Sequence, residues 1–96
     1  MFIVSLTYKV ELSEVEKHID AHIAYLEEHY DSGFFLASGR KVPRTGGVIL
    51  AQAENREALD AVLKEDPFYI EGVADFDVTE FVASKTAAGL ERLRDI

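Results

Sequence analysis

The three histidines of the sequence, His18, His22 and His29, all fall within residues 18–29. An imidazole exchanges protons near neutral pH, so each histidine is a candidate general acid or base. On a helical wheel His22 falls inside an apolar stripe and points inward, whereas His18 and His29 fall on one edge of the stripe beside Tyr25. An inward histidine is also a common core residue. The helix alone therefore leaves proton transfer and packing as alternatives, and it assigns no role to His18 or His29.

Metal binding and nucleophilic catalysis fit the sequence less well. His18 and His22 have the i, i+4 spacing of two zinc ligands on a helix, but the Glu of an H-E-x-x-H motif is absent and Lys17 adjoins the first histidine. The chain has no cysteine, and no serine stands in a G-x-S-x-G elbow. The glycines of SGRKVPRTGG lack the G-K-[ST] ending of a P-loop. We therefore expect no metal, no nucleotide and no cofactor.

Positive charge gathers in SGRKVPRTGG, residues 38–47, where Arg40, Lys41 and Arg44 stand close together. No Asp or Glu occurs in residues 32–53, although the chain carries 18 of them and its formal net charge is -8. Such a cluster suits the binding of a small anionic molecule. A solvated hairpin, or a contact with an acidic partner surface, explains the cluster equally well.

The composition indicates one small globular domain over residues 1–96. Hydrophobic residues make up 48% of the chain, which is typical of a folded core. The acidic balance argues against nucleic acids and anionic membrane surfaces as partners, because both favour a broad basic face. The N-terminus lacks the features of a signal peptide, and no stretch reaches the roughly 18 apolar residues of a membrane span. We expect a cytoplasmic protein.

The elements that position the candidate residues follow strand and helix periods in turn. Residues 2–10 alternate apolar and polar side chains, as a strand does. A helix follows, starting at a capping box of Ser13 and Glu16 and ending at Asp31. Its apolar stripe consists of Val15, Ile19, Ile23, Leu26 and Tyr30. Two strands, FFLASG and GGVILAQA, are then joined by the basic stretch as a hairpin connection.

The second half of the chain repeats the pattern. Asn55 can cap a helix that must end near Lys64, because Pro67 cannot continue it, and Asp66 then stands at the helix exit. The expected buried side of this helix is Ala58, Leu59, Val62 and Leu63. Residues 72–82 predict a fourth strand, and residues 84–93 a short C-terminal helix.

The order βαββαβ is typical of a ferredoxin-like α+β sandwich, with two helices on one face of a four-stranded antiparallel sheet. Residues 34–37 and 48–51 are apolar at successive positions, so both faces of these two strands favour burial. The helices cover only one face. A homodimer that joins two sheets about a two-fold axis would bury the other face, and we expect that assembly.

Several stretches together resemble the YciI-like proteins, also called the YCII-related family. They are AHIAYL with His22, the strand GFFLASG, the strand GGVILA, and EDPF after the second helix, and they span nearly the whole chain. The resemblance implies a dimeric α/β barrel of ferredoxin-like halves, similar to muconolactone isomerases and to a dehydrochlorinase of chlorinated hydroxyquinols. Many members carry Arg-Pro before the histidine and Gly-Pro after the second strand, where this chain has IDAH and SGRK.

The resemblance also implies an active site formed by a histidine and an aspartate, which correspond here to His22 and Asp66. A carboxylate bonded to one imidazole nitrogen fixes the tautomer and makes the other nitrogen a better base. Without a cysteine or an activated serine, the reactions within reach are proton abstraction beside a carbonyl, isomerisation of a lactone or enol, and elimination of chloride.

We therefore interpret the chain as a small cofactor-free lyase or isomerase acting on a small carboxylate, lactone or chlorinated aromatic. In this hypothesis the basic stretch holds the negative charge of the substrate near His22. The alternative is a non-catalytic dimer that binds a small ligand or serves as a scaffold. The candidate substrate-binding residues, some of which are equally explained by strand packing, are Tyr8, Ser38, Gly39, Arg40, Lys41 and Arg44.

Overall fold

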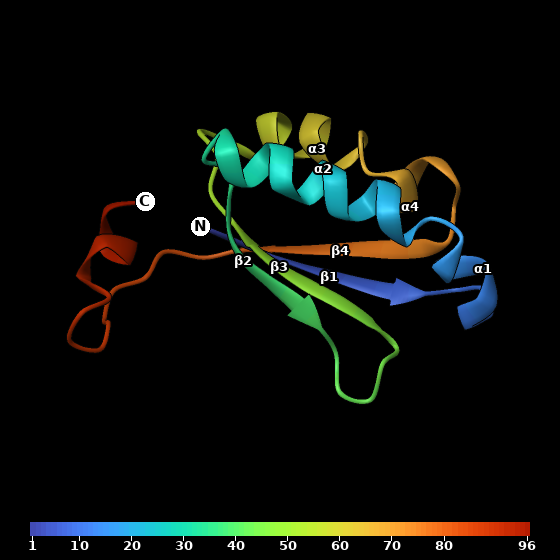
Figure 1. The fold of residues 1–96 in the computed structure, drawn as a ribbon. Coiled ribbons are helices and arrows are strands. Elements are labelled where there is room, and N and C mark those ends of the chain that lie inside the picture. The colour runs from blue at the N-terminus through green and yellow to red at the C-terminus, as the bar shows by residue number, and fades with distance from the viewer.

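The computed structural model describes residues 1–96, apart from the side chain of Asp95. Its centre is a four-stranded antiparallel sheet in the order β2-β3-β1-β4 (Figure 1). The strands are β1 (Phe2–Tyr8), β2 (Phe35–Arg40), β3 (Gly46–Ala51) and β4 (Ala74–Glu80). The helices are α1 (Leu12–Glu16), α2 (Ile19–Asp31), α3 (Arg56–Leu63) and α4 (Pro67–Ile70), followed by the 3-10 turn η1 (Glu91–Asp95). The predicted α+β fold with a four-stranded antiparallel sheet is confirmed.

The core lies between the sheet and the layer of α2, α3 and α4, which cover the same face (Figure 1). The alternation along β1 explains why. Phe2, Val4 and Leu6 point toward the helices and are buried, while Ile3 and Thr7 lie on the opposite, open face. The strand ends at Tyr8, so Val10, which the alternation included, lies beyond it.

The first predicted helix is divided in two, and its start differs from the prediction. The N-cap of α1 is Glu11, which makes no side-chain cap bond, and Ser13 lies inside the helix rather than capping it. The N–H groups of Lys17 and His18 then bond to carbonyls three residues back, which ends α1. A turn of this 3-10 type rotates the chain further per residue than an α-helix, in which each residue adds about 100°. The side chains of α2 therefore point in other directions than they would on one continuous helix that includes Val15.

This change of direction decides which side of α2 is buried. The buried side chains of α2 are Tyr25 and His29, although His29 was expected at the edge of the stripe. Ile23, which was expected to pack into the core, is 46% exposed, and Tyr30 is exposed as well. The inward direction predicted for His22 is confirmed, because its side chain is only 15% exposed.

The second helix follows the prediction closely. The Asn55 side chain accepts a hydrogen bond of 2.8 Å from the backbone N–H of Ala58, and α3 ends with Lys64 as its C-cap. A further short helix, α4, starts at Pro67, which the sequence analysis did not anticipate. None of the helices in the described part of the chain combines the length and apolar character needed to cross a membrane.

The C-terminal helix predicted over residues 84–93 is wrong. The chain leaves β4 as an extended arm that runs out past the end of the sheet, and it forms only η1 near its end (Figure 1). Most side chains from residue 84 to residue 92 are exposed, and Gly89 has a φ of 93°. An isolated helix of this length is marginal in water without a packing surface, and Gly89 weakens it further.

The start of β3 lies very close to β1. A Cβ atom at Gly46 would collide with the carbonyl oxygen of Leu6, so this strand pairing requires glycine at position 46. Gly46 and Gly47 also line the cavity between the hairpin and α2. The pair of glycines that the sequence suggested as turn residues therefore also leaves this cavity open.

Candidate active site

The structure brings His22 and Asp66 into direct contact. His22 Nδ1 lies 2.8 Å from Asp66 Oδ1, and the two residues are 44 positions apart in the sequence. Asp66 is fully buried, whereas the imidazole reaches the surface of a cavity. Because an ionised carboxylate only accepts hydrogen bonds, this contact places the proton on Nδ1 and leaves Nε2 as the acceptor. Nε2 forms no hydrogen bond with any described residue.

Local sequence holds Asp66 in place. The residue before a proline avoids the α region, and Asp66 is extended with φ −65° and ψ 126°. It acts as the N-cap of α4, and its Oδ1 also accepts a bond of 2.9 Å from the backbone N–H of Phe68. Oδ2 is buried and has no hydrogen-bond partner in the described part of the chain. The carboxylate is thus fixed by backbone geometry on one side and by His22 on the other.

Phe68 fixes the plane of the imidazole. Its ring stacks on that of His22 with centroids 3.9 Å apart and an angle of 2° between the planes. The opening of α4 therefore supplies both the carboxylate partner and the stacking surface for His22. The role of Phe68 could not be predicted from the stretch EDPF, because a phenylalanine two residues after an aspartate has the pattern of an ordinary core residue.

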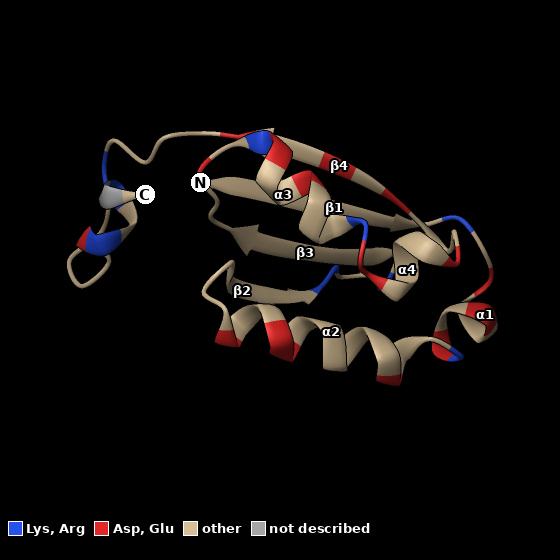
Figure 2. Cartoon of the chain, turned by 90° about the horizontal axis from the view of Figure 1, so that it is seen from above, with Lys and Arg blue, Asp and Glu red and all other residues tan. Residues whose placement is uncertain are grey.

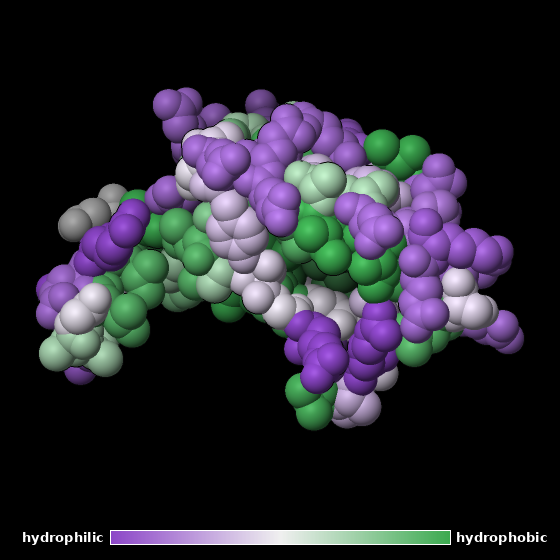
Figure 3. Space-filling model, viewed as in Figure 1, coloured by the Kyte–Doolittle hydropathy of each residue, from purple (hydrophilic) through white to green (hydrophobic). Residues whose placement is uncertain are grey.

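A cavity of about 500 Å³ opens between α2 and the β2–β3 hairpin. This volume is in the range of small-molecule sites, about 300–1,000 Å³. Apolar side chains, among them Leu6, Ile19, Ile23 and Leu26, form much of its wall. Figure 3 shows this hollow as green side chains beneath α2, with the hydrophilic hairpin below it. The predicted site residues that line the cavity together are Tyr8, His22, Ser38, Gly39, Arg40 and Arg44.

The structure separates the three cations of the hairpin. Arg40 lines the cavity, and it forms no ion pair within the described part of the chain. Arg44 also lines the cavity and lies 3.6 Å from Glu16 of α1. Lys41 does not reach the cavity, because its Nζ donates a hydrogen bond of 3.1 Å to Thr7 Oγ1. In Figure 2 the end of β2 is blue, whereas the charged residues of the neighbouring helix α2 are red. The structure thus gives Lys41 a partner on β1 outside the cavity, and Arg40 and Arg44 are the two cations of the hairpin that line it.

Two hydroxyl-bearing side chains that line the cavity each contact an aromatic residue. Ser38 Oγ lies 2.6 Å from the hydroxyl oxygen of Tyr30, which comes from α2. Ser38 is thus held in place by a residue that the sequence analysis assigned to the core stripe. Tyr8 packs edge-on against Phe68, with ring centroids 6.0 Å apart. Its contact with the stacking partner of His22 extends the aromatic part of the cavity wall.

Tyr25 lies behind the site and supports it. Its hydroxyl donates a hydrogen bond of 2.8 Å to the carbonyl oxygen of Val62, which ties α2 to α3. Burial raises the pKa of Tyr25 far above its usual value, and the negative charges of Asp66 and Glu65 raise it further. The phenol therefore stays protonated at neutral pH and acts as a donor in the core.

The strand order and the helices on one face define a small ferredoxin-like α+β protein with a histidine–aspartate pair beside a cavity. The chain belongs to the YCII-related domain family, whose sequence model matches residues 1–82. The arm after residue 82 lies outside that match.

A solved structure with a similar fold is 5-chloro-2-hydroxyhydroquinone dehydrochlorinase from Burkholderia phenoliruptrix AC1100, in complex with 2,5-dihydroxybenzoquinone. The TM-score is 0.63 and the sequence identity is 21%, with 84% of this chain and 93% of the other chain covered. At that identity the likeness concerns the fold. A search of curated proteins gives no match.

Proposed function

We propose that the chain is a lyase or isomerase in which His22, positioned by Asp66, moves protons on a small anionic ring compound. The observation that carries this proposal is the contact of 2.8 Å between Nδ1 and a fully buried carboxylate, on a histidine that lines a cavity. With Nδ1 engaged, Nε2 is the nitrogen that takes up and returns protons. The fold shared with a dehydrochlorinase supports a chlorinated hydroxyquinol as the substrate class.

Elimination of hydrogen chloride from such a substrate needs only proton transfer. Nε2 takes a proton from one phenolic oxygen and returns it to the ring carbon that bears chlorine, which turns the phenol into a ketone. A second hydroxyl then loses its proton, and its O–H electron pair forms a carbon–oxygen double bond. The ring double bond at that carbon shifts toward the carbon that bears chlorine, and chloride leaves with the electrons of the carbon–chlorine bond. The products are a quinone, chloride and one proton, so the reaction needs no oxidant or reductant.

The two arginines of the cavity supply the electrostatic part of this proposal. Removal of the first phenolic proton places negative charge on the ring oxygens, and guanidinium groups stabilise such charge with directed hydrogen bonds. Arg40 and Arg44 line the same cavity as His22. Glu16 partly neutralises Arg44, so Arg40 is expected to contribute more to binding.

The double substitution Arg40→Gln and Arg44→Gln is expected to weaken binding of 2,5-dihydroxybenzoquinone about 10- to 100-fold. The hydroxyl groups of this quinone ionise in neutral water, and a hydrogen bond to a charged group contributes about 1.5–3 kcal/mol, less where the groups are partly exposed. The measurement is a calorimetric titration of the purified variant with the quinone.

The matched control is the double substitution Lys9→Gln and Lys41→Gln, which removes two positive charges from outside the cavity. It should bind the quinone nearly as well as the wild type. Equal losses in both variants would show that net charge, and not the cavity, governs binding.

The open face of the sheet supports a second part of the proposal, which is a homodimer. Ile3 and Val48 on this face are each 37% exposed, and Ile3 pairs with Leu50 on the neighbouring strand. Figure 3 shows green side chains along the underside of the sheet, between the C-terminal arm and the hairpin. A second copy of this face would cover these side chains about a two-fold axis and form the barrel expected from the family.

Sedimentation equilibrium is expected to give twice the chain mass of 10.7 kDa at micromolar concentration. Ile3→Glu should shift the protein to the monomer, because it places charge in the buried centre of the interface. Val42→Glu, at the tip of the hairpin where the side chain is 91% exposed, should leave the dimer intact. A wild-type monomer would refute this part of the proposal.

A further inference from the structure

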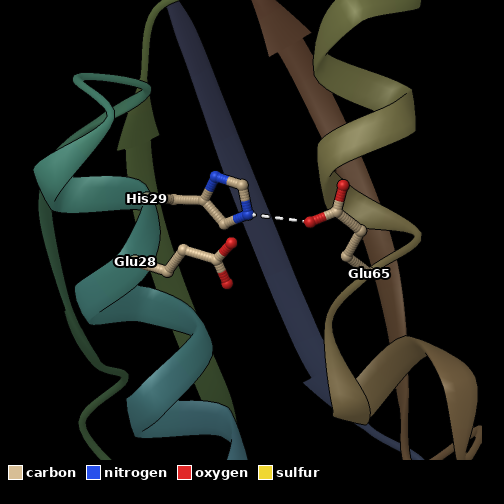
Figure 4. A group of neighbouring side chains, drawn as sticks. All are labelled: Glu28, His29 and Glu65. Carbon is tan, nitrogen blue, oxygen red and sulfur yellow. Dashed lines mark hydrogen bonds and ion pairs between the residues drawn. The ribbon is translucent and has the colours of Figure 1, made fainter.

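A second histidine–carboxylate contact lies on α2, next to the first. His29 Nε2 is 3.0 Å from Glu65 Oε1, and Glu65 directly precedes Asp66. Glu28 extends its carboxylate toward the same point, between α2 and the end of α3 (Figure 4). One nitrogen or oxygen atom from each of these three residues lies within 4.8 Å of the other two. Two carboxylates and one imidazole thus converge on a single small volume.

The charge of this cluster is not balanced by basic side chains. Within the described part of the chain, the Lys and Arg ion pairs involve other acidic residues, and neither Glu28 nor Glu65 takes part in one. Two carboxylates this close repel each other, in a chain whose net charge is already -8. A cation entering the cluster relieves that repulsion, and a neutral imidazole beside it is a preferred ligand of transition metals.

His29 has the burial and the partner expected of a metal ligand. Its side chain is only 8% exposed, so the ring is held while Nε2 faces the carboxylates. Ser32 Oγ lies 3.5 Å from Nδ1 and donates its own hydrogen to the His29 carbonyl oxygen at 3.1 Å. In the metal-free protein the contact with Glu65 places a proton on Nε2, because a carboxylate only accepts hydrogen bonds. A metal ion takes the place of that proton, and the serine oxygen can then accept the hydrogen bond of Nδ1–H.

The spacing of the ligand atoms suits a tetrahedral ion. Zinc bound at about 2.0–2.2 Å from nitrogen and oxygen places its ligands about 3.4 Å from one another. His29 and Glu65 are already at 3.0 Å. The Glu65 side chain is 56% exposed and Glu28 is also exposed, so rotation of these side chains can bring their carboxylate oxygens to the ligand spacing of zinc. A water molecule can serve as the fourth ligand.

We propose that His29, Glu65 and Glu28 form a binding site for a divalent transition metal of the zinc type. The site lies outside the cavity that contains His22, and the inference holds whether or not the chain catalyses the reaction proposed above. It departs from the expectation of no metal, which considered only the His18–His22 pair. A bound ion joins α2 to the segment that carries Asp66, and so it stiffens the connection between α3 and α4.

The test is a calorimetric titration of the untagged, metal-free protein with zinc chloride. The wild type is expected to bind one zinc ion per chain. Glu65→Gln and Glu28→Gln should each weaken binding by at least about tenfold, because the loss of even an outer-shell partner commonly costs about 10- to 100-fold. Glu27→Gln removes the same charge from the adjacent exposed position and should leave the affinity unchanged.

A second measurement separates ligation from charge. Cobalt(II) bound to the wild type should give the intense visible absorption of a tetrahedral site, and His29→Gln should abolish it while circular dichroism shows an intact fold. The proposal is overturned if zinc does not saturate at one site, or if Glu27→Gln weakens binding as much as Glu65→Gln. It is also overturned if His22→Asn, and not His29→Gln, removes the cobalt spectrum.

Discussion

For the proposed elimination, His22→Asn is expected to lower the rate of chloride release from 5-chloro-2-hydroxyhydroquinone about 10²- to 10⁴-fold, the range credited to a general acid or base. The asparagine amide nitrogen can take the place of Nδ1 and keep the hydrogen bond to Asp66, which spans 2.8 Å in the wild type. Nothing in the asparagine side chain reaches the position of Nε2. Turnover should therefore fall, while the affinity for 2,5-dihydroxybenzoquinone stays close to that of the wild type.

The control for this experiment is His18→Asn. His18 is the N-cap of α2 and does not line the cavity, and asparagine is a favourable N-cap residue. Chloride release and quinone binding should both be unchanged in this variant. If His22→Asn releases chloride at the wild-type rate, proton transfer by His22 is wrong. If that variant instead loses quinone affinity and turnover equally, His22 contributes to binding alone.

Asp66→Ala is expected to lower the free energy of unfolding by about 2–4 kcal/mol. The substitution leaves two donors without their acceptor, the backbone N–H of Phe68 and His22 Nδ1, and each such buried loss costs about 1–3 kcal/mol. Oδ2 has no partner in the described part of the chain, so relief of its burial offsets part of the loss. The measurement is urea denaturation followed by circular dichroism.

Asn55→Ala provides the matched control, because Asn55 is also an N-cap, and its bond to the Ala58 N–H is exposed. Loss of an exposed cap costs about 1 kcal/mol. A larger loss for Asp66→Ala would therefore measure the contribution of burial and of the contact with His22. Similar losses in both variants would mean that Asp66 acts only as a helix cap, which would weaken the proposed role of the His22–Asp66 pair.

The sequence by itself determined the order of the four strands and the places of the helices between them, because these signals are local. Residues 2–8 alternate in the period of a strand, and Asn55 satisfies donors in its own helix turn. Pro67 ends α3 and forces Asp66 into the extended conformation of an N-cap. Each of these effects acts over a few residues, so the chemistry of neighbouring side chains is enough to predict it.

Only the tertiary structure decided which side of α2 is buried and which residues meet at the site. A helical wheel assumes one continuous helix, and the tight turn at Lys17 and His18 breaks that continuity. The sequence pattern offered no way to pair His22 with Asp66, and only the family resemblance suggested it. Their contact depends on how α2 packs against α4, and packing is set by the whole core, not by any single stretch.

Tertiary packing also explains the other differences between the predicted and the observed positions of side chains. Arg40 is the last residue of β2 and lines the cavity, whereas Lys41 is the first residue beyond the strand and reaches Thr7 of β1. The stacking of Phe68 on His22 and the burial of His29 likewise arise from the approach of two helices. Composition identified the basic stretch, and the direction of each side chain came from the folded sheet.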